Sequence, residues 1–171
     1  MTSTNQTVRK DGLTIVRDFK APKTLVFEAF SKADAFAEWW GPVGMPITVL
    51  HFDFKQNGKL HYKMEGKGQT MWGIFIYRKI VNPDLIEFVN SFSDESGNIC
   101  KAPFPIDFPY EIFNHLTLEE NNGITTVTLS GHPINATPEQ EATYYSMMAN
   151  MTQGFNGTLN QLEAYLTKIQ K

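Results

Sequence analysis

Residues 137–171 are the segment that most restricts the folds open to this chain. The run Thr137-Pro138-Glu139-Gln140 is typical of a capped helix start, in which the threonine and glutamine side chains satisfy backbone N–H groups reciprocally. Gly154 and Gly157 favour a kink or a close backbone approach further along. Apolar residues recur every three or four positions, which predicts one apolar face on a helix about 45 Å long: Tyr144, Met148, Met151, Phe155, Leu159, Leu162, Leu166 and Ile169.

Seven earlier segments alternate apolar with polar residues, as strands covered on one face do. They lie at about residues 13–18, 47–54, 59–66, 70–81, 84–92, 111–119 and 124–131. Mostly short connections predict an antiparallel meander. Between the first two segments, Ala21-Pro22 opens a short helix and Gly41-Pro42 ends another. We therefore expect an α+β fold with a sheet of about seven strands, two short helices after strand one and a long C-terminal helix that spans the sheet.

The turn at Asn57-Gly58 decides how the strands beside it pair. A two-residue loop would mix polar and apolar residues on each face, whereas a loop of residues 56–58 separates them. That loop pairs Phe54 with Leu60, Phe52 with Tyr62 and Leu50 with Met64, and places Asp53 beside His61 and His51 beside Lys63. His51, Asp53 and His61 are residue types that bind zinc. On the polar face they would form a solvated cluster without a fourth ligand, so we assign no metal site.

Composition indicates a cytoplasmic globular protein. The 171 residues are 42% hydrophobic, and 15 basic against 18 acidic side chains give a net charge of −3. We expect a flexible tail at residues 1–11 and one domain at residues 12–171. The chain has no apolar run of about 20 residues that could span a membrane and no signal peptide. Cys100 is the only cysteine, which suits a reducing compartment, and three dispersed arginines offer no basic surface for nucleic acid.

Residues 93–110 interrupt the strand pattern. Prolines alternate there with aromatic residues, among them Phe104, Phe108 and Tyr110. Because a flexible linker would be polar, we expect an ordered loop. Long loops of this kind either cover a sheet edge or act as a lid, and the sequence leaves both roles open.

Four blocks of sequence together resemble one known family. They are Ala21-Pro22 through Phe30 with Trp39-Trp40-Gly41-Pro42; Trp72-Gly73 with Tyr77-Arg78; Asn90-Ser91-Phe92-Ser93-Asp94 with Gly97; and Met151-Thr152-Gln153-Gly154-Phe155 with Thr158-Leu159-Asn160-Gln161-Leu162. Over about residues 13–168 the chain resembles the SRPBCC family named after the activator of heat-shock-protein-90 ATPase (AHSA1-like). The resemblance implies the helix-grip architecture of the START and birch-pollen-allergen superfamily, a curved sheet wrapped on the C-terminal helix. Phe155 stands where relatives usually carry tryptophan.

Members of this superfamily hold apolar ligands between the sheet and the long helix, so the resemblance implies a ligand cavity here. Large side chains would line it, and methionines adapt to ligands of varied shape. The alternative is that these side chains fill the space themselves. Asn114 is a further candidate for orienting a polar group. The candidate ligand-binding residues are Trp40, Phe52, Tyr62, Met64, Trp72, Tyr77, Asn90, Phe92, Met148, Met151 and Phe155.

Three functions are compatible with this interpretation. We favour a cytoplasmic binding module for an apolar or amphipathic small molecule whose identity the sequence does not give. The alternatives are a stress-related co-chaperone or protein-interaction domain of the heat-shock-protein-90 ATPase activator type, and a lyase or cyclase that uses the cavity. No inward-facing Asp, Glu or Lys is evident in the strand pattern, so we assign no catalytic residue, no cofactor and no enzymatic activity. A homodimer and a chaperone partner both stay open.

Overall fold

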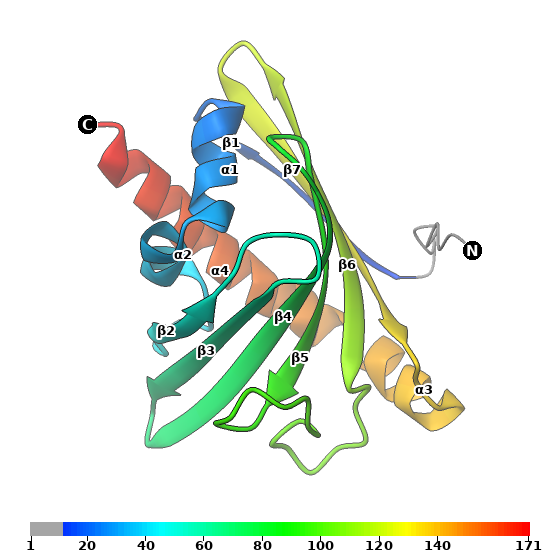
Figure 1. Ribbon diagram of the computed structural model, residues 1–171. Helices are drawn as coiled ribbons and strands as arrows, with labels where there is room; N and C mark the ends of the chain where they lie inside the picture. The colour runs from blue at the N-terminus through cyan, green and yellow to red at the C-terminus, as the bar shows by residue number, and fades with distance from the viewer. Residues whose placement is uncertain (1–11) are drawn as a thin grey trace.

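The computed structural model describes residues 12–171, and the tail expected at residues 1–11 lies outside this range. A curved sheet has α4 crossing it on one side, with α1 and α2 beside that helix (Figure 1). The helices of residues 12–171 are all too short or too polar to span a bilayer. The elements are β1 (Leu13–Phe19), α1 (Lys23–Ser31), α2 (Ala33–Trp39), β2 (Ile47–Phe52), β3 (Lys59–Gly66), β4 (Gln69–Val81), β5 (Leu85–Ser93), β6 (Glu111–Asn121), β7 (Ile124–Ile134), α3 (Pro138–Ser146) and α4 (Met148–Ile169).

All neighbouring strands of the sheet run antiparallel, in the order β1-β7-β6-β5-β4-β3-β2. The first strand therefore closes the meander by pairing with the last. Alternate residues of each strand point to the face that α4 covers, and Leu60, Phe75, Phe88 and Leu116 are buried there in one core with Leu162 of α4. The expected seven-stranded helix-grip fold is confirmed.

The C-terminal helical region begins as the sequence predicts. The Thr137 hydroxyl accepts from the Gln140 N–H at 3.1 Å, and the Gln140 side chain accepts from the Thr137 N–H at 3.0 Å. The region then breaks at Met147, whose φ of −103° and ψ of 8° are not helical. The Tyr144 hydroxyl donates to the Gly131 carbonyl at 3.0 Å, which holds α3 at the end of β7. The break therefore lies before α4, and α4 itself runs through both of its glycines.

The predicted pairing of β2 with β3 is wrong by two residues next to the turn and by three farther along, where Ile47 rather than Leu50 lies opposite Met64. Phe52, not Phe54, lies opposite Leu60, and His51 lies opposite His61. The register also shifts between Val49 and His51, which makes the intervening residue a bulge. The strict alternation on which the prediction depends therefore does not hold along β2.

Phe54 explains this difference. It lies outside β2 and packs from the connection onto Phe27 and Tyr77, with ring centroids 5.8 and 4.9 Å away. The connection consequently covers residues 53–58, and the Asp53 N–H donates to the Lys59 carbonyl at 2.9 Å. Contact with the aromatic core thus overrides continued strand pairing.

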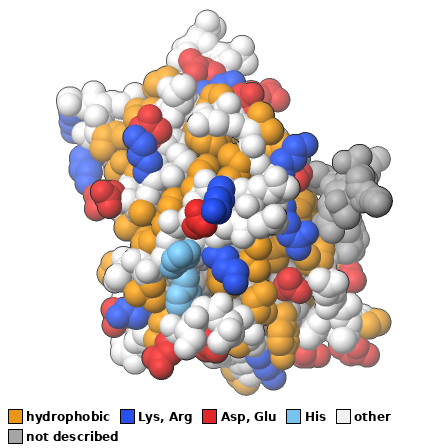
Figure 2. All heavy atoms as spheres, viewed as in Figure 1, with side chains coloured by type: hydrophobic (Ala, Val, Ile, Leu, Met, Phe, Trp, Pro, Cys, Tyr) orange, Lys and Arg blue, Asp and Glu red, His pale blue; other side chains and the backbone are white. Residues whose placement is uncertain are grey.

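The expected exposed cluster of His51, Asp53 and His61 does not form. His61 is buried, with a ring nitrogen 3.2 Å from the carbonyl oxygen of Asp94. The carboxylate of Asp53, in the connection, lies 3.5 Å from the Lys55 ammonium group. Among residues 12–171 no three His, Cys, Asp or Glu side chains lie close enough to hold a metal ion. Acidic and basic side chains are interspersed with hydrophobic ones over the face in view in Figure 2.

Residues 94–110 connect β5 to β6 across one end of the sheet (Figure 1). The Phe104 ring packs on Phe92 at a centroid distance of 5.6 Å, and the Phe108 ring lies 6.2 Å from Tyr144. The loop is therefore attached to both the sheet and α3. This places its aromatic residues beside the space between the sheet and α4.

Candidate functional site

A cavity lies between the concave face of the sheet, the first half of α4 and the 94–110 loop. Its larger part, here called the outer compartment, has a volume of about 460 Å³, within the range of small-molecule sites. Its wall is mostly apolar. The outer compartment is lined by Trp40, Gly41, Pro42, Tyr62, Met64, Met71, Gly73, Asn90, Ser91, Phe92, Phe104, Phe108, Pro109, Tyr110, Ile112, Asn150, Met151, Gly154, Phe155 and Thr158.

An inner compartment of about 280 Å³ adjoins the outer one. It extends toward β7 and α3, where Gly131 and Tyr144 form part of its wall. Because the two compartments share wall residues, they lie side by side. The shared residues are Asn90, Phe92, Phe104, Phe108, Ile112, Met151 and Phe155.

Gly73 allows the ring of Tyr62 to lie against the sheet. Tyr62, Gly73 and Phe92 are register partners on β3, β4 and β5, so all three positions face the cavity. A Cβ atom at Gly73 would lie 2.4 Å from Cζ and 2.5 Å from the hydroxyl oxygen of Tyr62. Any larger residue at this position would push the ring into the cavity.

Tyr62 is a neutral hydrogen-bonding group in an apolar wall. It is 5% exposed, and burial raises the pKa of its phenol to about 12, although a hydrogen bond with the Trp40 side chain acts in the opposite direction. The indole N–H of Trp40 can only donate. The Tyr62 hydroxyl therefore accepts from Trp40 and retains its own proton at neutral pH.

One pair of amides interrupts the apolar wall. Nδ2 of Asn114, on β6, donates to Oδ1 of Asn90, on β5, at 3.2 Å and to the Ile112 carbonyl at 3.1 Å. Asn114 is buried, whereas Asn90 is half-buried and borders both compartments. The hydroxyl of Thr158, also in the wall, donates to the Gly41 carbonyl at 3.0 Å. That hydroxyl proton is already engaged within the protein.

The part of the cavity wall that the described residues form carries no charged side chain. Within residues 12–171, neither compartment is lined by Lys, Arg, His, Asp or Glu. His115 Nδ1 and Glu87 Oε2 lie 2.7 Å apart. These two residues are register partners on β6 and β5, and their side chains point to the face of the sheet away from the cavity. Burial raises the pKa of the Cys100 thiol, which disfavours a nucleophilic thiolate, and Cys100 is outside both linings. The described wall thus offers neutral donors rather than a charged acid–base pair.

The structure brings seven of the eleven candidate residues together around the outer compartment. These residues come from the end of α2, from β3 and β5, and from the first half of α4. They are Trp40, Tyr62, Met64, Asn90, Phe92, Met151 and Phe155.

The other four candidates lie elsewhere. Trp72 points to the opposite face of β4, because Gly73 occupies the inward position beside it. Tyr77 is buried in the aromatic core, and Phe52 stacks with Phe54 there. Met148 packs on the core at the start of α4 without lining either compartment. Its predicted position assumes one uninterrupted helix, and the break before α4 changes the helical phase.

Several wall residues are absent from the sequence-based set. Phe104, Phe108 and Tyr110 belong to the loop that the sequence leaves open as either a lid or an edge cover. Gly154 and Thr158 follow Met151 at intervals of three and four residues along α4, so helical spacing could have identified them. Wall positions that depend on how a loop folds back have no comparable local signal: Pro42, Pro109 and Tyr110.

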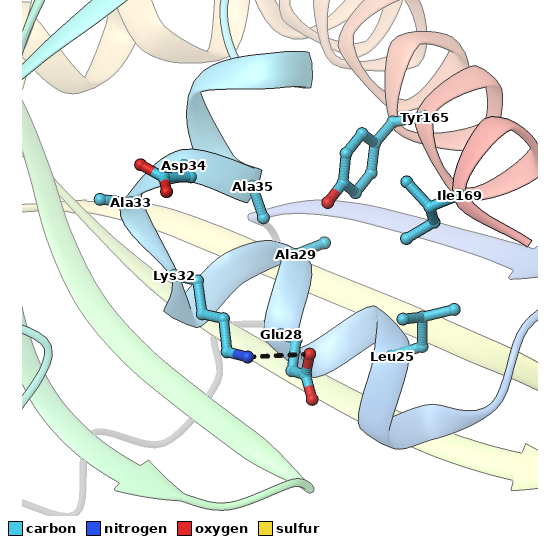
Figure 3. A pocket seen from close by; sticks show the side chains of 9 residues that line it. All are labelled: Leu25, Glu28, Ala29, Lys32, Ala33, Asp34, Ala35, Tyr165 and Ile169. Atoms are coloured by element: carbon cyan, nitrogen blue, oxygen red, sulfur yellow. Dashed lines mark hydrogen bonds and ion pairs between the residues drawn. The ribbon is translucent and has the colours of Figure 1, made fainter.

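Figure 3 shows a separate hollow on the surface, between α1, α2 and the C-terminal end of α4. Its volume is about 500 Å³. Glu28 and Lys32 form an ion pair at 3.2 Å on its border, which Asp34 also lines, while Tyr165 and Ile169 form the opposite side. Its charged border makes this hollow less suited to an apolar molecule than the cavity under the sheet.

Comparisons with known proteins agree with this architecture. The family model described as activator of Hsp90 ATPase homolog 1-like protein matches residues 20–167. Protein Ms6760 of Mycobacterium smegmatis is 26% identical, with a TM-score of 0.74 over 96% of each chain. A protein of Arthrobacter aurescens is also 26% identical, with a TM-score of 0.76 over 96% of this chain and 93% of that one.

The fold is similar at lower identity as well. The AHSA1 protein of Silicibacter pomeroyi is 18% identical, with a TM-score of 0.69 over 91% of this chain and 97% of that one. No curated protein matches the chain in sequence. These similarities support the architecture, and the chemistry of the site has to be argued from its own residues.

Proposed function

The chain belongs to the activator of Hsp90 ATPase homolog 1-like family, and on that premise we propose that it is a binding module for an apolar or amphipathic small molecule held between the sheet and α4. The observation that supports this role is the cavity under the sheet, whose two neighbouring compartments measure about 460 and 280 Å³. The fold does not specify a ligand. The cavity wall does restrict its chemistry, because aromatic and methionine side chains dominate it.

The driving force for such binding is burial of apolar surface. At about 25 cal/mol per Å², a ligand that loses about 200 Å² of apolar surface to this wall gains about 5 kcal/mol before the costs of association. Met64, Met71 and Met151 line the outer compartment. Their flexible side chains would let the wall adjust to ligands of different shape.

We assign the 94–110 loop the role of a lid. Phe104 and Tyr110 line the outer compartment while remaining 41% and 44% exposed. Large apolar side chains usually avoid such exposure. Their position suits groups that cover a ligand when the loop is closed and must separate from the wall when the ligand leaves.

The binding proposal can be tested with N-phenyl-1-naphthylamine, an uncharged probe whose fluorescence rises in apolar surroundings. Gly154 lines the outer compartment, and a Cβ atom there would meet no atom within 4 Å. Gly154→Leu should therefore project a side chain into the cavity and weaken probe binding at least ten-fold. Gly154→Ala is the matched control, since it makes the same change in helix propensity with little bulk and should bind the probe as the natural protein does.

The result that would contradict the proposal is equally specific. If the probe fails to bind the natural protein, or if Gly154→Leu binds it as well as Gly154→Ala does, the cavity is not the binding site. Circular dichroism of both variants should match that of the natural protein, because residue 154 faces open space rather than packed core.

A further inference from the structure

We propose that the cavity selects an uncharged ligand that presents a hydrogen-bond acceptor, such as a ketone, ester or amide carbonyl, to the side-chain amide of Asn90. This inference rests on the proposed binding function and adds a chemical class to it. Two observations carry it: the way the backbone orients the Asn90 amide, and the absence of charged groups from the described cavity wall.

A backbone carbonyl determines the orientation of the two amides. The Ile112 carbonyl can only accept a hydrogen bond, so the Asn114 atom 3.1 Å from it must be the Nδ2 donor. The same nitrogen lies 3.2 Å from Asn90, whose facing atom must therefore be the acceptor Oδ1. A Cβ atom at Gly131 would lie 3.1 Å from Oδ1 of Asn114, so glycine at that position leaves room for the amide in this orientation.

The Asn90 side chain consequently directs its NH₂ group away from Asn114. Its Nδ2 donates to no residue in the range 12–171, and the side chain borders both compartments. A group that is held at its oxygen and unengaged at its nitrogen is a preorganised donor. A ligand acceptor placed near the junction of the compartments would satisfy it.

The lack of charge in the described wall disfavours ionic ligands. No Lys, Arg, His, Asp or Glu of the described chain lines either compartment. A carboxylate would lose its hydration without gaining a cation, and an ammonium group would find no carboxylate. A carbonyl has a much smaller desolvation cost, which one hydrogen bond from Asn90 can offset. The Tyr62 hydroxyl is a second neutral donor in the same wall.

The test is competition against bound N-phenyl-1-naphthylamine by three molecules with the same ten-carbon chain: 2-decanone, decanoate and decylammonium, at pH 7.5. We expect 2-decanone to displace the probe at a concentration at least ten-fold lower than either ion. Asn90→Leu keeps a similar volume but removes the donor, so it should lower the ratio of 2-decanone affinity to probe affinity about five-fold. Asn160→Leu, at an exposed position of α4 outside the wall, is the matched control and should change neither affinity.

Asn114→Leu provides an independent variant, because it releases the Asn90 amide to rotate and should reduce the preference for 2-decanone part of the way. Suppose that the probe binds and that Gly154→Leu blocks it, so that the cavity is the binding site. The inference is then overturned if decanoate or decylammonium competes as well as 2-decanone does. It is also overturned if Asn90→Leu leaves the ratio of 2-decanone affinity to probe affinity unchanged. The binding function would survive that outcome. Failure of the probe to bind in the cavity would instead refute the binding function and this inference together.

Discussion

The contact between Gly73 and Tyr62 makes a quantitative prediction. In Gly73→Ala the new methyl group would lie 2.4 Å from the Tyr62 ring. Ordinary carbon–carbon contact needs about 3.5 Å, so the ring must move about 1 Å toward the cavity. Overpacking of this kind costs about 1–3 kcal/mol, and loss of the hydrogen bond with Trp40 adds about 1 kcal/mol. Restricting the unfolded chain offsets at most about 1 kcal/mol, so we expect a net loss of about 2 kcal/mol.

A double-mutant cycle separates this contact from a general intolerance of alanine in the strand. Tyr62→Leu removes the ring atoms that the methyl group would meet, so Gly73→Ala in that background should be neutral or slightly stabilising. Urea denaturation of the four proteins should give a coupling energy of about 2 kcal/mol. Equal costs of Gly73→Ala in both backgrounds would refute the argument that Gly73 exists to accommodate the Tyr62 ring.

Three other predictions concern the helix cap, the buried phenol and the loop. Thr137→Ala should lower the free energy of unfolding by about 1 kcal/mol because it removes the reciprocal capping bonds, and a urea midpoint equal to that of the natural protein would contradict this. The raised pKa of Tyr62, about 12 instead of 10.0, favours the protonated folded state, so the contribution of this phenol to stability should be complete below pH 10 and about 2 kcal/mol smaller at pH 12. The Tyr62→Phe variant should lose less stability than the natural protein between pH 10 and pH 12. An identical loss of stability in the variant and the natural protein would exclude Tyr62 as the cause. Deleting residues 101–108 should speed probe release in stopped-flow measurements more than it lowers thermal stability, whereas an unchanged release rate would exclude a lid.

Sequence patterns predicted the parts of this fold that local interactions determine. The start of the helical C-terminus is one example, because the capping bonds join residues only three positions apart. The break at Met147 had no such signal. It accompanies a hydrogen bond between Tyr144 and Gly131, whose partners belong to different elements and meet only in the folded chain. The β2–β3 register failed for a similar reason, since Phe54 is positioned by the core rather than by its strand.

The candidate site was predictable to the extent that strand alternation applies. Tyr62 and Phe92 occupy inward positions as expected, and Asn90, whose orientation the sequence left open, also lines the cavity. Choosing Trp72 by its size, rather than by its position next to an inward glycine, assigned it to the wrong face of β4. The orientation of the Asn90 amide depends on a carbonyl of the neighbouring strand, and no feature of the sequence alone could have revealed it.

The most direct test of the account is a two-dimensional ¹H–¹⁵N NMR titration of the protein with 2-decanone. Binding in the cavity predicts shifts of the backbone amides of Gly73 and Met151, together with a marked shift of the Asn90 side-chain NH₂ group, which reports a new hydrogen bond directly. The resonances of Lys32 and Tyr165, in the surface hollow beside α1 and α2, should stay in place. Shifts confined to that hollow, or a spectrum unchanged at saturating ligand, would contradict the claim that the space between the sheet and α4 is a binding site.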